Sequence, residues 1–270
     1  MQTPGERFDH LVEIMRRLRA PDGCPWDRAQ TLTSLRPFLL EETYEALEAL
    51  DRDDAEGLRE ELGDLLFEIV FLSQIAAEAG VFTVGDAIDA VAVKLVRRHP
   101  HVFGESPRAQ SADEVLGRWE DLKRDERAKG GAGPKATLEG VPRTLPGLLR
   151  AYEYGSRAAA VGFDWERAAD VLDKIDEEVR ELREAVEAAA GATPPGPSRH
   201  IEEEMGDLLF AIANLSRKLG VEPECALRAA NDKFARRFNE LEHRFAARGA
   251  SMKNAGLDAL EAEWQAIKQG

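Results

Sequence analysis

The sequence predicts an all-α protein built from two tandem helical modules. Apolar residues recur every three to four positions in nearly every long segment, a period typical of amphipathic helices. Ala, Leu, Glu and Arg dominate these segments, and all four residue types are strong helix formers. Alternating runs of Val, Ile and Thr bounded by turn residues are missing. We therefore expect helices and no sheet.

Breaker residues divide the expected helices into two groups. In chain order, the helical period covers residues 7–18, 35–50, 55–79, 84–98, 112–129, 168–189, 201–219, 222–248 and 257–268. Gly and Pro cluster at 130–134, with Pro142 and Pro146 beyond them, which predicts a linker. A second cluster at 191–197 is expected to form a loop between antiparallel helices. The expected organisation is a first module over 1–129, a linker over 130–146 and a second module over 147–270, each resembling a four-helix bundle.

An internal repeat supports the two modules. Residues 61–70 (ELGDLLFEIV) and 204–213 (EMGDLLFAIA) are identical at seven of ten positions. Three shorter patterns recur in the same order: EExxE at 41–45 and 177–181, KxxRR at 94–98 and 233–237, and WxxxK at 119–123 and 264–268. The offsets between the copies are 136 to 145 residues. Two tandem copies of one helical module explain this order better than chance does.

Composition and charge exclude several functional classes. With 36 Lys and Arg against 51 Asp and Glu, the formal net charge is −15, which argues against a broad surface for nucleic-acid polymers. No apolar run approaches the ~18 residues of a membrane span, and residues 1–7 lack the pattern of a secretory signal. Cys24 and Cys225 are isolated, so neither a disulfide framework nor a cysteine-based zinc site is expected. We expect a cytoplasmic protein without a membrane partner.

Acidic residues of the repeated motifs share helix faces. Residues three or four apart lie on one face of a helix, so the two acidic residues of each motif project together. If the two helices of each copy pack antiparallel, their four carboxylates converge. The first copy supplies Glu42, Glu45, Glu61 and Asp64, and the second supplies Glu178, Glu181, Glu204 and Asp207.

A charge run on a helix is usually a solvated face, but two features favour a metal site here. Like charges at these spacings repel by roughly 0.2–0.5 kcal/mol per pair. Asp64 and Asp207 lead directly into Leu-Leu-Phe, so they border a core-facing stripe. A purely structural cluster is expected to have Lys or Arg opposite, and we expect none. Oxygen ligands without cations predict Mg²⁺, with Mn²⁺ as a substitute, rather than zinc.

The rival metal site is a di-iron centre of the ferritin type. Such a centre needs a Glu-x-x-His motif on each of two helices. The chain has one, from Glu240 to His243, and it lies outside the acidic motifs. Three residues after Asp207 stands Phe210, not His. The sequence therefore favours Mg²⁺ over iron.

The ordered motifs resemble those of the MazG family of all-α nucleoside triphosphate pyrophosphohydrolases. EExxE is followed by ExxD after 15 residues in the first copy and 22 in the second. Cys24-Pro-Trp-Asp27, Arg97-Arg-His-Pro-His-Val-Phe103 and residues 203–210 (EEMGDLLF) complete the likeness. The resemblance implies Mg²⁺-dependent hydrolysis of nucleoside triphosphates to monophosphate and pyrophosphate, as nucleotide-pool housecleaning. It also implies that the four carboxylates of each copy are metal ligands, and that Glu177 supports them or acts as a base.

Basic and aromatic residues of the repeats are candidates for substrate binding. Lys233 and Arg237 share a helix face and would hold phosphate oxygens, unless they form a solvated edge. Trp264 would stack on the base while Lys268 meets phosphate, unless Trp264 only packs on the bundle. The first copy supplies Lys94, Arg98, Trp119 and Lys123 at the same places.

Two other motifs allow a functional and a structural interpretation. His99 and His101 could contact phosphate, but a structural role beside Pro100 is favoured. Residues 163–165 (Phe-Asp-Trp) could approach the nucleotide or fix the start of a helix.

Both copies keep every motif, so the sequence alone does not assign catalysis to one of them. Two-copy members of the family suggest the second copy as the main catalyst, with the first as a weaker site, a regulatory site or a dimerisation platform. We expect a homodimer and weak base selectivity. Attack at the α- or β-phosphorus stays open. The alternative outside enzymology is an acidic helical scaffold whose repeats mediate association.

Overall fold

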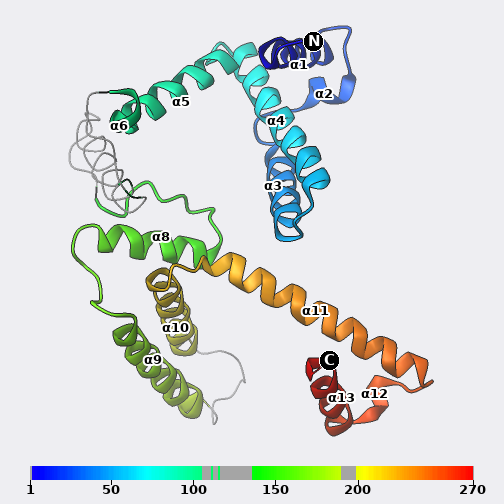
Figure 1. Ribbon diagram of the computed structural model, residues 1–270, viewed down its shortest axis with the longest axis vertical. Coiled ribbons are helices and arrows are strands. Elements are labelled where there is room, and N and C mark those ends of the chain that lie inside the picture. The colour runs from blue at the N-terminus through cyan, green and yellow to red at the C-terminus, as the bar shows by residue number, and fades with distance from the viewer. Residues whose placement is uncertain (1, 105–110, 112–114, 116–135, 190–198, 270) are drawn as a thin grey trace. The chain divides into compact units, whose positions relative to one another are not determined.

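The computed structural model describes residues 2–104, 111, 115, 136–189 and 199–269. Within these ranges the regular secondary structure is helical and no strand occurs, which confirms the all-α prediction. Packing divides the chain into two compact units, Met1–Leu122 and Lys123–Gly270, called the first and second unit below. Figure 1 shows the helices of both units.

The first unit is built around a helical hairpin. Its helices are α1 (Pro4–Leu18), α2 (Pro25–Ala29), α3 (Arg36–Asp51), α4 (Ala55–Glu78), α5 (Val84–Arg98) and α6 (Pro100–Phe103). The α3–α4 turn places Asp53 at φ 53°, and the Asp54 carboxylate then accepts the backbone N–H groups of Glu56 and Gly57. This cap starts α4 immediately, so α3 and α4 pack side by side.

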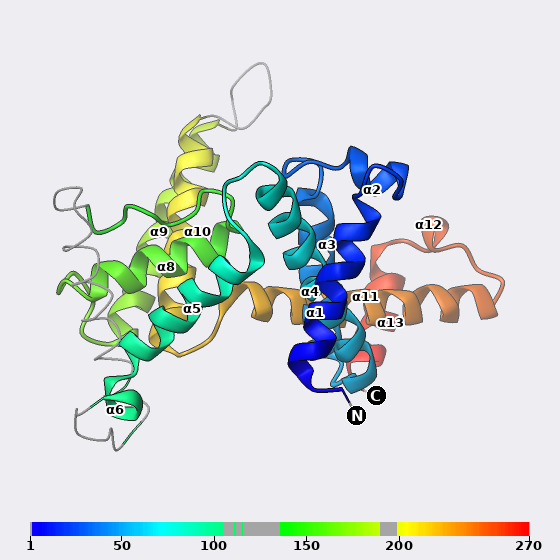
Figure 2. The same ribbon diagram turned by 90° about the horizontal axis from the view of Figure 1, so that it is seen from above.

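The core of the first unit lies between this hairpin and α1. Helix α1 packs on α4 (Figure 2). Met15, Leu35, Val70 and Phe71 are almost completely buried there, with Phe8, Phe38 and Phe67 among the residues around them. Burying side chains of this size stabilises the fold by roughly 1.5–3 kcal/mol each. The packing fixes which face of α4 turns towards α3.

The second unit repeats the hairpin and adds a long helix. Its helices are α8 (Gly147–Ala159), α9 (Ala168–Ala189), α10 (Arg199–Lys218), α11 (Pro223–Ala247), α12 (Met252–Ala255) and α13 (Leu257–Gln269). Helix α10 packs on both α9 and α8, and α13 packs on α11. Figures 1 and 2 both show α13 near the end of α11 that lies away from α9 and α10.

Helix α8 was not expected from the sequence, nor were the short helices α2, α6 and α12. Pro146 directly before α8 is compatible with a helix start, but Gly155 lowers the intrinsic helix propensity of the segment. Gly155 is needed because α8 lies very close to α10. A Cβ atom at this position would lie 2.2 Å from Asn214 Oδ1. Tertiary packing therefore overrides the local preference.

The structure tests the remaining expected helix and linker boundaries only in part. The helix expected over 112–129, the loop over 191–197 and the start of the linker lie almost entirely outside the described residues. Residues 136–146 form turns that pack on α8: Val141 is buried, Arg150 donates to the Arg143 carbonyl and Arg157 donates to the Glu139 carbonyl. No helix among the described residues is long and apolar enough to cross a membrane.

Candidate metal centres

Each helical hairpin brings three glutamates together. In the first unit these are Glu42 and Glu45 of α3 and Glu61 of α4, and we call them the first trio. The second trio is Glu178 and Glu181 of α9 with Glu204 of α10. Within each trio, one carboxylate oxygen per residue lies within 4.8 Å of the others. This spacing suits oxygen ligands around one hard divalent cation.

The aspartates of the two ExxD motifs lie beside the trios rather than within them. Asp64 is close enough to Glu42 for its charge to raise the pKa of that carboxyl, second only to the effect of burial. Asp207 is exposed on α10, one turn beyond Glu204. The structure thus brings together three of the four expected ligands of each copy within this distance.

The first trio is electrostatically strained without a cation. Burial and the charges of Asp64, Glu45 and Glu61 raise the pKa of Glu42. The pKa of Glu61 is raised too, by desolvation and then by Glu45 and Asp64. Repulsion between closely spaced carboxylates disfavours the charged form of each. A bound cation would relieve this repulsion.

The second trio, in contrast, has a lysine. Lys174 Nζ lies 2.7 Å from Glu178 Oε1 and 3.1 Å from Glu177 Oε1. These hydrogen bonds, first to Glu178 and then to Glu177, raise the pKa of Lys174. His200 Nδ1 also lies 3.3 Å from Glu204 Oε1. The expectation of no cation beside the carboxylates is therefore wrong for this copy. The signal was visible in the sequence, since Lys174 stands four residues before Glu178.

Helices α11 and α13 carry an aromatic cluster with basic residues around it. The rings of Phe234 and Trp264 have centroids 5.3 Å apart, and those of Phe234 and Phe238 are 5.8 Å apart. Trp264 is half-buried, so it packs on the bundle and keeps part of its ring accessible. Lys233 and Lys268 are exposed and Arg237 is half-buried. The second trio lies on α9 and α10, away from α13 within the same unit (Figure 1).

The matching residues of the first unit are only partly described. Lys94 is exposed on α5 and Arg98 is half-buried at its end. Trp119 and Lys123 lie outside the described residues. His99 Nδ1 lies 2.7 Å from the Leu95 carbonyl, a contact that closes the end of α5. This supports the structural interpretation of His99.

The Phe163–Trp165 motif joins two helices instead of facing the trio. The Asp164 carboxylate accepts hydrogen bonds from Arg217 and, at 2.7 Å, from Lys218 Nζ. Both donors stand near the end of α10. Phe163 is largely exposed. The motif therefore fixes the start of α9 relative to α10.

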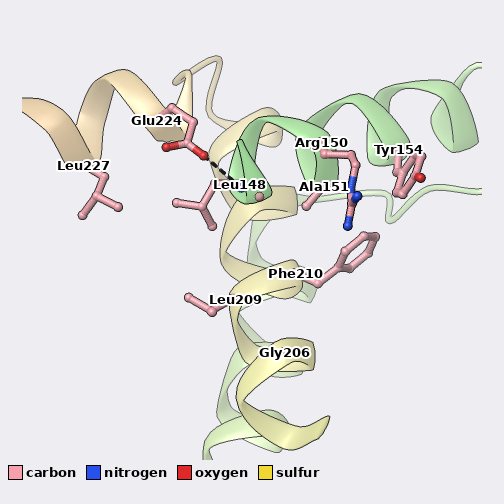
Figure 3. Close-up of a pocket in the computed structure, with 10 residues that line it drawn as sticks. Leu148, Arg150, Ala151, Tyr154, Gly206, Leu209, Phe210, Glu224 and Leu227 are labelled. Carbon is pink, nitrogen blue, oxygen red and sulfur yellow. Dashed lines mark hydrogen bonds between the residues drawn. The ribbon is translucent and has the colours of Figure 1, made fainter. Parts of the chain in front are cut away.

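A pocket of about 510 Å³ lies on the neighbouring face of α10 (Figure 3). Gly206, Leu209 and Phe210 of α10 line it together with residues of α8 and the start of α11. Glu224 accepts the backbone N–H groups of Leu148 at 3.0 Å and Leu149 at 3.4 Å, and so caps α8 beside the pocket. Because Gly206 stands between Glu204 and Asp207, the pocket adjoins the acidic motif.

Comparison with known proteins matches both hairpins to one family. The model of the MazG nucleotide pyrophosphohydrolase domain matches residues 30–103 and again residues 167–241. The chain is 48% identical over 265 residues to a nucleoside triphosphate pyrophosphohydrolase of Escherichia coli strain K12, covering 97% of each chain. It is 42% identical over 270 residues to the nucleoside triphosphate pyrophosphohydrolase/pyrophosphatase MazG of Thermotoga maritima, covering 100% of this chain and 99% of that one. A Mycolicibacterium smegmatis nucleoside triphosphate pyrophosphohydrolase is 37% identical over 191 residues, 68% of this chain and 57% of its own.

Proposed function

Because the chain belongs to the MazG nucleotide pyrophosphohydrolase family, we propose that it hydrolyses nucleoside triphosphates to monophosphate and pyrophosphate. The observation that carries the proposal is the convergence of three carboxylates in each hairpin. Relatives that match nearly the whole chain carry this activity in their names. The reaction breaks a phosphoric anhydride bond with water, so the enzyme is a hydrolase.

The chemistry of the second trio fits Mg²⁺. Glu178, Glu181 and Glu204 offer oxygen ligands within 4.8 Å of one another, and Asp207 stands one turn further along α10. When bound, Mg²⁺ lowers the pKa of a coordinated water and neutralises charge on phosphate oxygens. Mn²⁺ prefers the same ligands and would substitute.

The residues around the second trio have separate roles in this proposal. We assign to Glu177, which shares Lys174 with Glu178, the role of accepting a proton from the attacking water. Lys174 balances the charge of Glu178 while no cation is held there. We assign phosphate binding to Lys233, Arg237 and Lys268 and base stacking to Trp264, although α13 lies away from the second trio in the single chain. Stacking on an indole face tolerates any base, which supports broad specificity.

Homodimerisation is part of the proposal. Helix α5 has no buried residue in the single chain, and its apolar side chains Ile88, Val91, Val93, Leu95 and Val96 are between 42% and 64% exposed. On α11, Phe234 is 57% exposed. Apolar surface of this kind is commonly covered by a second copy in helical bundles. Sedimentation should therefore give a dimer, and a concentration-independent monomer of 29.9 kDa would contradict it.

One assay separates this function from an acidic scaffold. Pyrophosphate release from ATP, GTP, CTP and UTP is measured with Mg²⁺ and with a chelator. We expect release from all four triphosphates only with Mg²⁺. Release from none of them, by a folded dimer, would favour the scaffold. Orthophosphate instead of pyrophosphate would contradict the reaction.

A further inference from the structure

Glu68 on α4 is a buried carboxylate that the proposed reaction does not use. Its residue is only 4% exposed, and its Oε2 has no hydrogen-bond partner. Burial raises the pKa of Glu68, and the charge of Asp64 raises it further. Leaving a buried carboxylate oxygen without a partner is costly. The unpaired oxygen of such a group would be stabilised by a bound ligand.

Glu68 continues the acidic face of the first unit inwards. It stands four residues beyond Asp64 and seven beyond Glu61, so the three share one face of α4. Helix α3, which carries Glu42 and Glu45, packs on α4. Asp64 lies within electrostatic reach of both Glu42 and Glu68. The carboxylates therefore extend from the first trio, through Asp64, to the buried Glu68.

The second unit is built differently at both corresponding positions. With the offset of 143 residues, Glu68 corresponds to the buried Ala211. With the offset of 136, Lys174 corresponds to Phe38. At these two positions, the first unit thus has one more carboxylate and one fewer ammonium group than the second unit. Among the residues the structure describes, no Lys, Arg or His forms an ion pair with any of five carboxylates, those of Glu42, Glu45, Glu61, Asp64 and Glu68.

We propose that Asp64 and Glu68 hold a divalent cation in the first unit, beside the first trio, with Glu68 as a ligand that the second unit lacks. The ligands are all carboxylate oxygens, so the cation is a hard one such as Mg²⁺ or Mn²⁺. It gives Glu68 Oε2 its partner and balances the excess negative charge. Because no lysine competes for these carboxylates, the first unit binds the cation without a nucleotide. This inference does not depend on the proposed hydrolysis.

The test is a titration with Mn²⁺ alone, without nucleotide. The full chain carries Glu178→Gln and Glu204→Gln, which remove two ligands of the second trio. Free Mn²⁺ is followed by its electron paramagnetic resonance signal. We expect Glu68→Gln to raise Kd at least about tenfold. The matched control is Glu60→Gln, because Glu60 is exposed on the same helix and carries the same charge. It should change Kd less than about twofold, since its charge is screened by solvent.

Thermal melting distinguishes the loss of a cation ligand from a general loss of stability in the variant. Glu68→Gln keeps the shape of the side chain and removes a buried charge, so the metal-free protein should melt at the same or a higher temperature. The rise in Tm on adding Mn²⁺ should shrink in this variant and stay in Glu60→Gln. Equal Mn²⁺ affinities for the two variants would overturn the proposal, whether both are weakened or neither. Such a result would not bear on the proposed hydrolysis, because the second trio is disabled and no nucleotide is present. Pyrophosphate release from the wild type tests the hydrolysis separately.

Discussion

The two hairpins carry the same motifs but balance their charges in opposite ways. In the second unit, Lys174 neutralises Glu178, and an alanine occupies the interior position of α10. In the first unit, Phe38 replaces the lysine and joins the core, and Glu68 adds a buried charge. Lys174 therefore offsets part of the negative charge of the second trio, whereas no Lys, Arg or His among the described residues pairs with the first trio. Motif identity alone does not reveal this difference.

A second difference concerns the ion pair between each hairpin and an earlier segment of its unit. In the first unit, Arg19 beyond α1 pairs with Glu78 at the end of α4, at 2.7 Å. In the second unit, Asp164 beyond α8 pairs with Arg217 and Lys218 at the end of α10. The signs of the partners are exchanged, and with the offset of 143 residues Arg217 and Lys218 correspond to Gln74 and Ile75 rather than to Glu78. Each unit therefore has an ion pair near the end of its hairpin, but at a different position of the repeat.

We expect the largest effect from replacing one proposed metal ligand of the second unit, compared with replacing the corresponding residue of the first unit. Glu178→Gln should lower kcat by about a hundredfold or more, because a metal ligand is lost. Glu42→Gln should lower it less than about threefold. Steady-state pyrophosphate release measures both, with helicity checked by circular dichroism. The opposite pattern would place catalysis in the first unit.

Many features of the two hairpins could be predicted from the sequence, and the others depended on how the helices pack. Period and repeat predicted the helices α3, α4, α9, α10 and α11, and the grouping of glutamates on α3 with α4 and on α9 with α10. The sequence did not predict α8, because Gly155 lowers its helix propensity and the close contact with Asn214 is visible only in the packing. Burial of Glu68 was equally inaccessible. Its register on α4 places it on the acidic face, but only the packing shows that no solvent reaches it.

The next effect concerns the tryptophans of the two WxxxK motifs. Trp264→Ala should raise KM for ATP, GTP, CTP and UTP by similar factors, about fivefold or more, since stacking is worth ~1–3 kcal/mol. The value of kcat should change less, because stacking is present in both the ground and transition states. Trp119→Ala is the matched variant and should leave KM unchanged. An unaltered KM in Trp264→Ala would mean that this ring only packs on Phe234, and a loss for one base would reveal a selective pocket.

A smaller effect is expected from the lysine that distinguishes the two trios. Lys174→Gln removes the ammonium group beside Glu178, so the metal-free second trio becomes more negative. Its Mn²⁺ affinity without nucleotide should rise several-fold, because a competing cation within 4 Å is lost. Arg180→Gln, an exposed change on the same helix, is the control. Isothermal titration calorimetry on chains with Glu42→Gln, Glu61→Gln and Glu68→Gln isolates the second unit, because these changes also weaken the cation site proposed at Asp64 and Glu68. Unchanged affinity would mean that Lys174 does not compete for the site.

The smallest effect is a dependence of stability on pH, and it should come from the first unit. The folded pKa of Glu42 is raised above its ordinary value of about 4.3, chiefly by burial and then by Asp64, so the folded state keeps a proton that the unfolded state releases. Stability therefore falls as pH rises above about 4.3, until the folded pKa is passed. In a chelator, Tm should fall over this window, because stability and Tm fall together. Glu42→Gln should flatten the fall and Mg²⁺ should suppress it. Glu178→Gln should not, because Lys174 already balances that carboxylate in the second unit. A fall of the same size in all three proteins would show that the general negative charge of the chain, and not the first trio, sets the pH dependence.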